Sequence, residues 1–213
     1  MPEDLGRRER KKQLTRQALV NAAVRLFTAK GYDQTSVADI AEAADVSKRT
    51  FFLHFATKED VLLADGSRRI DLAVQAIAAR KPGASIQEAL AEATRSMIAD
   101  TAAGDLPSGL AALRAQLVVT APTVQARVLH TIFTAQTRIA EALHRAYPQA
   151  LDEVTAAAVV GALMGAVSAA AVTSLQHAEP PERTRAAMQH AAEIALHCLE
   201  APHLSDSTDD ATP

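Results

Sequence analysis

Cationic side chains are concentrated near the start of the chain. Residues 1–58 contain 11 Lys and Arg against 7 Asp and Glu, whereas residues 59–213 contain 11 against 18. Opposite charge in the two parts indicates that the first part meets a polyanion, while the acidic remainder only has to stay soluble. A basic run, which alone is equally typical of a solvated tail, opens the first part and consists of Arg7, Arg8, Arg10, Lys11, Lys12 and Arg16.

Side chains that could support catalysis or metal binding are sparse. His190, Glu193 and His197 would share one face of a helix, but polar surface or interface residues are the commoner explanation of such spacing. Cys198 is the only cysteine, which excludes an internal disulfide and fits a reducing cytoplasm. We find no glycine-rich phosphate loop, nucleophile elbow or secretory signal. We therefore expect a cytoplasmic protein without enzymatic activity, metal or cofactor.

The elements that must position the cations are predicted to be helical. Hydrophobic residues make up 48% of the chain and aromatic residues only 3%, with Ala and Leu abundant, so we predict an all-α fold. From Thr15 to Lys30, apolar residues recur at three- and four-residue spacing, which is typical of a helix with one buried face. Gly31 then ends this helix, because glycine readily adopts the left-handed conformation that closes a helix.

Two short helices follow. Ser36 and Asp39 have the spacing of an N-terminal cap for the second helix, and Ser47 caps a third helix over residues 48–55. Asp45–Val46 is the turn between them. Thr57 and Asp60 provide a similar start signal for a fourth helix. Helices joined by so short a turn predict a helix-turn-helix motif.

The stretch from Leu26 to Val61 resembles the N-terminal signature of the TetR family of transcriptional regulators. It fixes residue types at more than a dozen positions over roughly 35 residues, which makes it a specific motif. The family resemblance implies a three-helix DNA-binding domain and a C-terminal helical domain for ligand binding and dimerisation, about nine helices in all. We accordingly expect a basic flexible arm at 1–12, the helix-turn-helix domain at 13–58, the ligand-binding and dimerisation domain at 59–202 and a disordered tail at 203–213.

The third helix would lie in the major groove of double-stranded DNA. Phe51 and Phe55 should face the core with Phe27 and Ile40, while the helix N-terminus faces outward. We expect Arg49 to read guanine O6 and N7. The resemblance implies phosphate contacts from several other residues, so that the complete predicted DNA-binding set is Thr35, Ser47, Lys48, Arg49, Thr50, Phe52, His54 and Lys58.

Each of these residues also has an alternative interpretation that involves no contact with DNA. The cations could be solvated surface residues, and His54 could be a satisfied hydrogen-bond donor. The chain also departs from the family pattern: Asp45 and Arg49 stand where glycine is common, and Phe52 replaces a tyrosine. Asp tolerates the left-handed region better than most residues, so the turn remains plausible. The DNA contacts of relatives do not carry over directly at Arg49 and Phe52.

Behind this motif, Pro and Gly divide the chain into helical segments near 59–80, 85–103, 108–120, 123–146, 150–177 and 182–200. Residues 154–176 carry no charge and are long enough to span a bilayer, but their Ala, Gly, Ser and Thr content and the lack of a basic flank argue against a membrane span. Gly161 and Gly165 allow close approach of another helix. The resemblance implies that the segments near 150–177 and 182–200 form a homodimer interface; the alternative is an intramolecular core helix.

The resemblance also places a ligand pocket in the second domain. Large apolar side chains that could line it, although core packing is the alternative for each, are Met97, Leu113, Leu117, Leu129, Phe133 and Met164. Because five of the seven aromatic residues lie before residue 56, an aliphatic or acyl-type ligand is expected rather than a flat aromatic cation. The predicted function is a repressor that binds a near-palindromic operator and is released by a small molecule. The alternative is a helix-turn-helix regulator or architectural protein without such a ligand, and an activator is also open.

Overall fold

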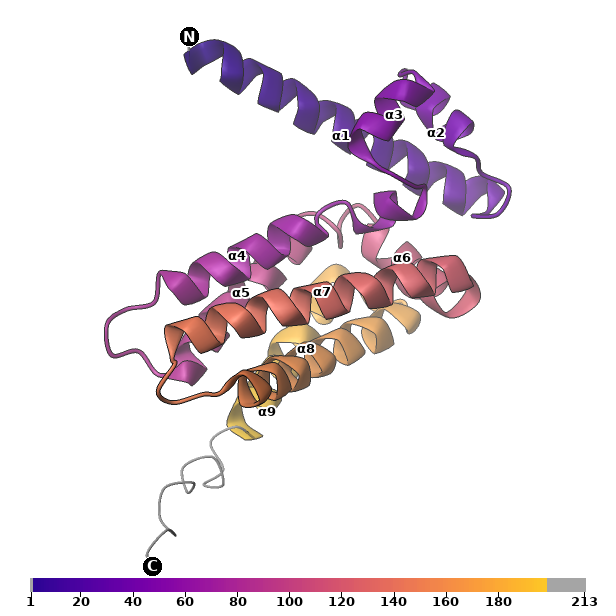
Figure 1. Cartoon of the computed structure of the whole chain (residues 1–213). Coiled ribbons are helices and arrows are strands. Elements are labelled where there is room, and N and C mark those ends of the chain that lie inside the picture. Colours follow the sequence, from indigo (N-terminus) through magenta and orange to yellow (C-terminus); the bar gives the residue numbers. More distant parts are fainter. Residues whose placement is uncertain (1, 199–213) are drawn as a thin grey trace, which may run out of the picture. The chain divides into compact units, whose positions relative to one another are not determined.

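The computed structural model describes residues 2–198 and divides the chain into two compact units (Figure 1). Within the described residues, the first unit comprises 2–65 and Ser108–Leu129, and the second comprises Gly66–Pro107 and 130–198. The described residues are helical with connecting turns, as the composition predicts. The tail predicted to be disordered, residues 203–213, lies outside the described residues.

The regular elements are, in chain order, α1 (Pro2–Lys30), α2 (Val37–Ala43), α3 (Lys48–His54), the 3₁₀ helix η1 (Glu59–Leu63), α4 (Gly66–Ala78), α5 (Ile86–Ala103), α6 (Leu110–Thr120), α7 (Pro122–Ala146), α8 (Glu153–Gln176) and α9 (Pro181–Cys198). The nine α-helices of this described range confirm the predicted all-helical plan.

Two predicted boundaries differ from the structure. The first helix begins at Pro2, so the described part of the expected flexible arm is helical. The reason is local, since most residues of the basic run are Arg, Lys, Glu or Gln, which are good helix formers. The helix predicted over 59–80 is divided into η1 and α4. Thr57 and Asp60 do exchange the predicted hydrogen bonds, at 3.0 and 3.3 Å between nitrogen and oxygen, but the turn that follows is 3₁₀.

The helix-turn-helix forms as the capping residues predict. Ser36 Oγ accepts a hydrogen bond from the Asp39 backbone N–H, and the Asp39 carboxylate accepts one from the Ser36 backbone N–H. Asp45 adopts a φ of 55°, the left-handed conformation expected of this turn. α2 packs beside the C-terminal half of α1 and α3 follows it (Figure 1).

The core of the first unit combines the three head helices with later helices. The rings of Phe27, Phe51 and Phe55 are buried together with Ile40, which confirms the predicted inward face of α3. Side chains of α6 and of the first part of α7 belong to the same core and are Leu110, Leu113, Leu117 and Val124. The compact unit around the motif is therefore larger than residues 13–58.

The second unit packs α4, α5, α8, α9 and the rest of α7 around aliphatic side chains. The largest that are fully buried are Ile77, Leu90, Leu143 and Val160. A buried ion pair joins α4 to the segment after α5, with 3.0 Å between Arg69 Nη2 and Asp105 Oδ2. Among the described residues, α8 is the one helix long and apolar enough to cross a bilayer, yet only 22% of its most apolar window is buried.

Candidate nucleic-acid interface

The outward face of α3 carries both cationic and apolar side chains. Lys48 and Arg49 are exposed at its N-terminus, while Phe52 and Leu53 are 56% and 71% exposed. Phe51, on the opposite face, is fully buried. Residues four apart are neighbours on a helix, so Arg49 and Leu53 lie together at the centre of the outward face.

The start of α3 is fixed by its cap. Ser47 Oγ accepts a hydrogen bond from the Thr50 backbone N–H at 3.0 Å, and the two hydroxyl oxygens lie 2.9 Å apart. Thr50 is half-buried, whereas Ser47 is exposed. These contacts order the helix N-terminus and thereby set the direction in which Lys48 and Arg49 project.

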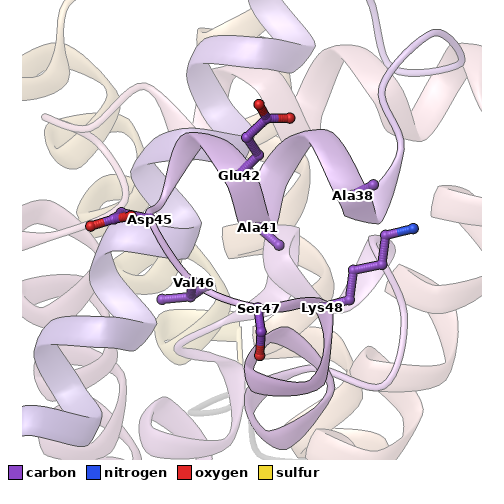
Figure 2. Close-up of a pocket in the computed structure, with 7 residues that line it drawn as sticks. All are labelled: Ala38, Ala41, Glu42, Asp45, Val46, Ser47 and Lys48. Atoms are coloured by element: carbon purple, nitrogen blue, oxygen red, sulfur yellow. The ribbon is translucent and has the colours of Figure 1, made fainter.

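An open pocket of about 600 Å³ lies between α2 and the start of α3, and Figure 2 shows the seven residues that line it. Glu42 and Asp45 contribute two carboxylates, and Ser47 and Lys48 lie toward α3. A phosphate would be repelled by the two carboxylates. The lining combines these two acidic residues with Lys48, and we assign no ligand to the pocket.

The side chain of Thr35, a predicted DNA-binding residue, is buried in the free protein. It is 1% exposed, and its hydroxyl donates to the Gly31 carbonyl oxygen at 2.8 Å. Its backbone N–H donates to the Tyr32 carbonyl oxygen at 3.3 Å. The hydroxyl is used to close the loop after α1, and the predicted phosphate contact of Thr35 stays a prediction.

Lys58 is likewise engaged inside the protein. Its Nζ donates to the carbonyl oxygens of Tyr32, at 3.0 Å, and Thr35, at 3.3 Å, and lies 4.0 Å from the centroid of the Tyr32 ring. Tyr32 Oη donates to the Glu59 carboxylate and lies 3.1 Å from Thr123 Oγ1. Burial and the hydrogen bond to Glu59 raise the pKa of Tyr32 to about 12, so its hydroxyl keeps its proton. Lys58 clamps the loop between α1 and α2.

Arg16, which the sequence analysis assigned only to the basic run, ties α1 to the end of α3. Its Nη1 donates to the His54 carbonyl oxygen at 2.9 Å, and its Nη2 donates to the Ala64 carbonyl oxygen. The guanidinium carbon also lies 4.2 Å from the centroid of the Phe55 ring. This arginine therefore holds the C-terminus of α3 against both α1 and the segment that leads to α4.

His54 does not match the interpretation that its side chain is a satisfied hydrogen-bond donor. Its Nδ1 is buried and has no hydrogen-bond partner among the described residues, so the alternative of a satisfied donor does not hold for that atom. Burial lowers the pKa of His54, and the positive charges of Arg16 and Lys12 lower it further. A neutral imidazole offers a phosphate one ring N–H donor but no positive charge.

The six predicted ligand-binding residues are distributed over the two units. Leu113 and Leu117 are buried in the first core, as the packing alternative expects. Met97 and Met164 are partly buried against the second core. On α7, Leu129 is 48% exposed and Phe133 is 66% exposed. The positions of these six residues do not test the predicted pocket, which stays a prediction.

Metal-binding residues are not assembled in the described part of the chain. Over residues 2–198, no group of three or more His, Cys, Asp or Glu is placed to hold a metal ion. His190 Nδ1 and the Glu193 carboxylate are 3.8 Å apart, but both side chains are at least 75% exposed. At this exposed helix surface, His190 and Glu193 form a solvated pair.

Leu53 was absent from the predicted set, although its sequence position could have revealed it. It lies four residues after Arg49, on the same helix face, and is exposed. The roles of Arg16 and Lys58 carried no such signal, because their acceptors are backbone carbonyls distant in sequence.

Comparison with known proteins agrees with the geometry of α2 and α3. Residues 19–64 match the family model of bacterial regulatory proteins, tetR family. The HTH-type transcriptional regulator TcmR of Streptomyces glaucescens is 39% identical over 105 residues, which cover 49% of this chain and 46% of TcmR. The chain thus spans less than half of the length of that curated relative.

Solved structures show the same fold over most of the chain. The fatty acid degradation regulator FadR from Bacillus halodurans aligns with a TM-score of 0.60 and 20% identity, covering 87% of this chain and 96% of that one. FadR of Thermus thermophilus, a TetR family repressor solved with lauroyl-CoA, aligns with a TM-score of 0.57 and 24% identity, covering 93% and 97%.

Proposed function

We propose that this chain is a transcriptional regulator of the TetR family, whose model residues 19–64 match, and that it binds a near-palindromic DNA operator through α3. The observation that carries the proposal is the exposed Arg49 beside Lys48 at the N-terminus of a capped α3. An α-helix fits the major groove of B-DNA, where a guanidinium can donate to both O6 and N7 of guanine. Because DNA lies in the bacterial cytoplasm, the protein acts there.

The residues proposed to contact DNA follow from their exposure. Arg49 reads a base, Lys48 binds a base or a phosphate, and Phe52 contributes an apolar surface. Ser47 and Thr50 cap α3 and lie at the edge of this surface. Thr35 and Lys58 hold the loop between α1 and α2 in place, since the Thr35 hydroxyl and the Lys58 ammonium bond to backbone carbonyl oxygens within the protein. The His54 side chain is assigned no contact to DNA.

Selection of DNA by the full-length protein tests this proposal. The chain would be incubated with DNA from upstream of its own gene and with a randomised duplex library, and bound DNA would be sequenced. We expect a near-palindromic site bound at least about 10³-fold more tightly than random sequence. Binding without sequence preference would overturn the proposed function.

We further propose that α8 and α9 pair with those of a second copy. α8 is 24 residues long, uncharged after Glu153, and exposes small residues at helical spacing that include Ala158, Ala162, Gly165 and Ala169. An apolar helix with so little buried surface requires a cover, and two copies related by a two-fold axis would supply it. Two heads on one dimer would then match two operator half-sites.

Enlarging Gly165 tests the dimer. A Cβ at this position meets no atom within 4 Å in the isolated chain, so Gly165→Leu should fold but obstruct a partner helix. Light scattering should give about twice 22.5 kDa for the wild type and 22.5 kDa for the variant. Ala103→Leu, which places the same leucine side chain at an exposed position on α5, is the control. A Gly165→Leu variant that stays dimeric would contradict this interface. Sedimentation of the wild type with liposomes would also contradict it, because a bilayer would then cover α8.

We also propose that a small aliphatic or acyl-type molecule releases the protein from DNA. Phe133 and Tyr147 are the only aromatic residues after Phe55, and Tyr147 Oη already donates to the carbonyl oxygens of Ala84 and Ser85 at 3.0 Å. The likeness to FadR of Thermus thermophilus, whose structure holds lauroyl-CoA, motivates the choice of probe and shares only the fold with this chain.

Thermal unfolding with lauroyl-CoA, free fatty acid and a flat aromatic cation tests the ligand class. A true ligand at 100 times its dissociation constant should stabilise the protein by about 2.7 kcal/mol and lower the affinity for the selected DNA. Stabilisation by the aromatic cation alone would make the aliphatic assignment wrong. No response to a broad panel would favour a regulator without a small-molecule ligand.

A further inference from the structure

We propose that Leu53 is a specificity-determining residue that contacts the C5-methyl group of a thymine next to the guanine read by Arg49. The proposal rests on the proposed function, because it requires α3 to lie in the major groove. It adds a base and a recognition mode that the family resemblance did not assign to this position.

Exposure and helix position single out Leu53. At 71% it is more exposed than Leu14, Phe52 and Val119, the other exposed large apolar side chains of α1 to α6 in the first unit. It lies opposite the fully buried Phe51 and next to Arg49 on the helix surface. Water covers this leucine in the isolated chain, although removing apolar surface from water is favourable.

The chemistry of Leu53 restricts what it can bind. Its side chain has no donor or acceptor and therefore cannot hold a phosphate or hydrogen-bond a base edge. The thymine methyl is the apolar group that a base pair presents in the major groove. Lys48 and Arg49, on the same short helix, make the surroundings cationic, so the charge of this face complements DNA.

Helix and duplex geometry limit where the thymine can lie. Four residues advance about 6 Å along an α-helix, and successive base pairs are about 3.4 Å apart. A side chain at position 53 therefore reaches a base pair within about two steps of the one that Arg49 contacts. Each half-site of the operator should contain a guanine and a thymine at this separation.

Replacing thymine with uracil removes only the C5-methyl group and therefore tests the proposed contact with Leu53. Full-length protein would be titrated with the duplex recovered from the randomised library, in which each thymine near the guanine is replaced singly by deoxyuridine. Loss of one buried methyl should weaken wild-type binding about 4-fold at one thymine per half-site. In Leu53→Ala, binding to the thymine duplex should be weaker and the difference between thymine and uracil should vanish.

Two further variants keep the result interpretable. Leu53→Ala should fold, because the side chain is exposed and alanine favours the helix, and circular dichroism would verify this. Val119→Ala removes an exposed apolar side chain from α6 and should leave the uracil effect unchanged.

The inference is overturned if no uracil weakens wild-type binding near the guanine, or if the loss is the same in Leu53→Ala as in wild type. Failure of the proposed function has a different signature: the wild-type protein would recover no preferred duplex. Such an outcome would remove the basis for both proposals.

Discussion

Replacing Lys58 with methionine distinguishes two possible roles of this residue. Lys58 either binds a DNA phosphate or holds the loop between α1 and α2 in place. The structure places Lys58 Nζ at hydrogen-bond distance from two carbonyl oxygens and 4.0 Å from the Tyr32 ring centroid. Methionine keeps most of the apolar stem and removes the charge. Allowing for partial exposure, the loss of two charge-assisted hydrogen bonds and one cation–π contact should cost about 2 to 3 kcal/mol of unfolding free energy.

Two assays on the same variant decide between the roles. Urea unfolding followed by circular dichroism measures stability, and the slope of log affinity against log salt counts the phosphates neutralised. For Lys58→Met we expect the stability loss and an unchanged salt slope. Lys48→Met is the matched control, because Lys48 is exposed: its stability should change by less than about 0.5 kcal/mol while its slope falls by about 1.

The reverse pattern would refute this reasoning. If Lys58→Met lowered the salt slope by about 1 and left unfolding unchanged, the ammonium would be a phosphate ligand in the complex. The contacts to Tyr32 and Thr35 would then describe only the free protein.

Three other variants give independent checks. Thr35→Val should cost about 1 kcal/mol in urea unfolding and leave the salt slope unchanged, because the hydroxyl bonds to Gly31 and not to DNA. Because the pKa of His54 is lowered in the folded protein, the unfolded state binds protons more readily at this residue. The free energy of unfolding should therefore fall as the pH drops below about 6.5. In denaturation curves measured at several pH values, His54→Gln should show a shallower fall than the wild type. Arg69→Met leaves the buried Asp105 without its 3.0 Å ion pair and should lower unfolding free energy by about 3 kcal/mol, whereas a loss below about 1 kcal/mol would contradict a structural role.

Features set by neighbouring residues were predictable from the sequence. Ser36 with Asp39, the Ser47 cap and the left-handed Asp45 all formed as their local patterns predict. The buried face of α3 followed from helical spacing. Each of these depends on residues within four positions, so one sequence contains the necessary information.

Features set by distant contacts were not predictable in this way. Arg16 reaches carbonyl oxygens 38 and 48 residues away, and Lys58 reaches carbonyls 23 and 26 residues away. A cation in a basic segment therefore looks like a ligand for phosphate until its acceptors are known. The helical start of α1 was missed for another reason: the basic run has good helix propensity but no apolar periodicity.

The central claim is that α3 reads DNA sequence, and one competition titration tests it most directly. Wild type and Arg49→Ala would be titrated with the selected duplex and with a scrambled duplex at one salt concentration. The account predicts that Arg49→Ala loses about 1 to 3 kcal/mol of affinity for the selected duplex and little for the scrambled one, because a base contact is removed. An equal loss on both duplexes, or wild type that does not distinguish them, would contradict it.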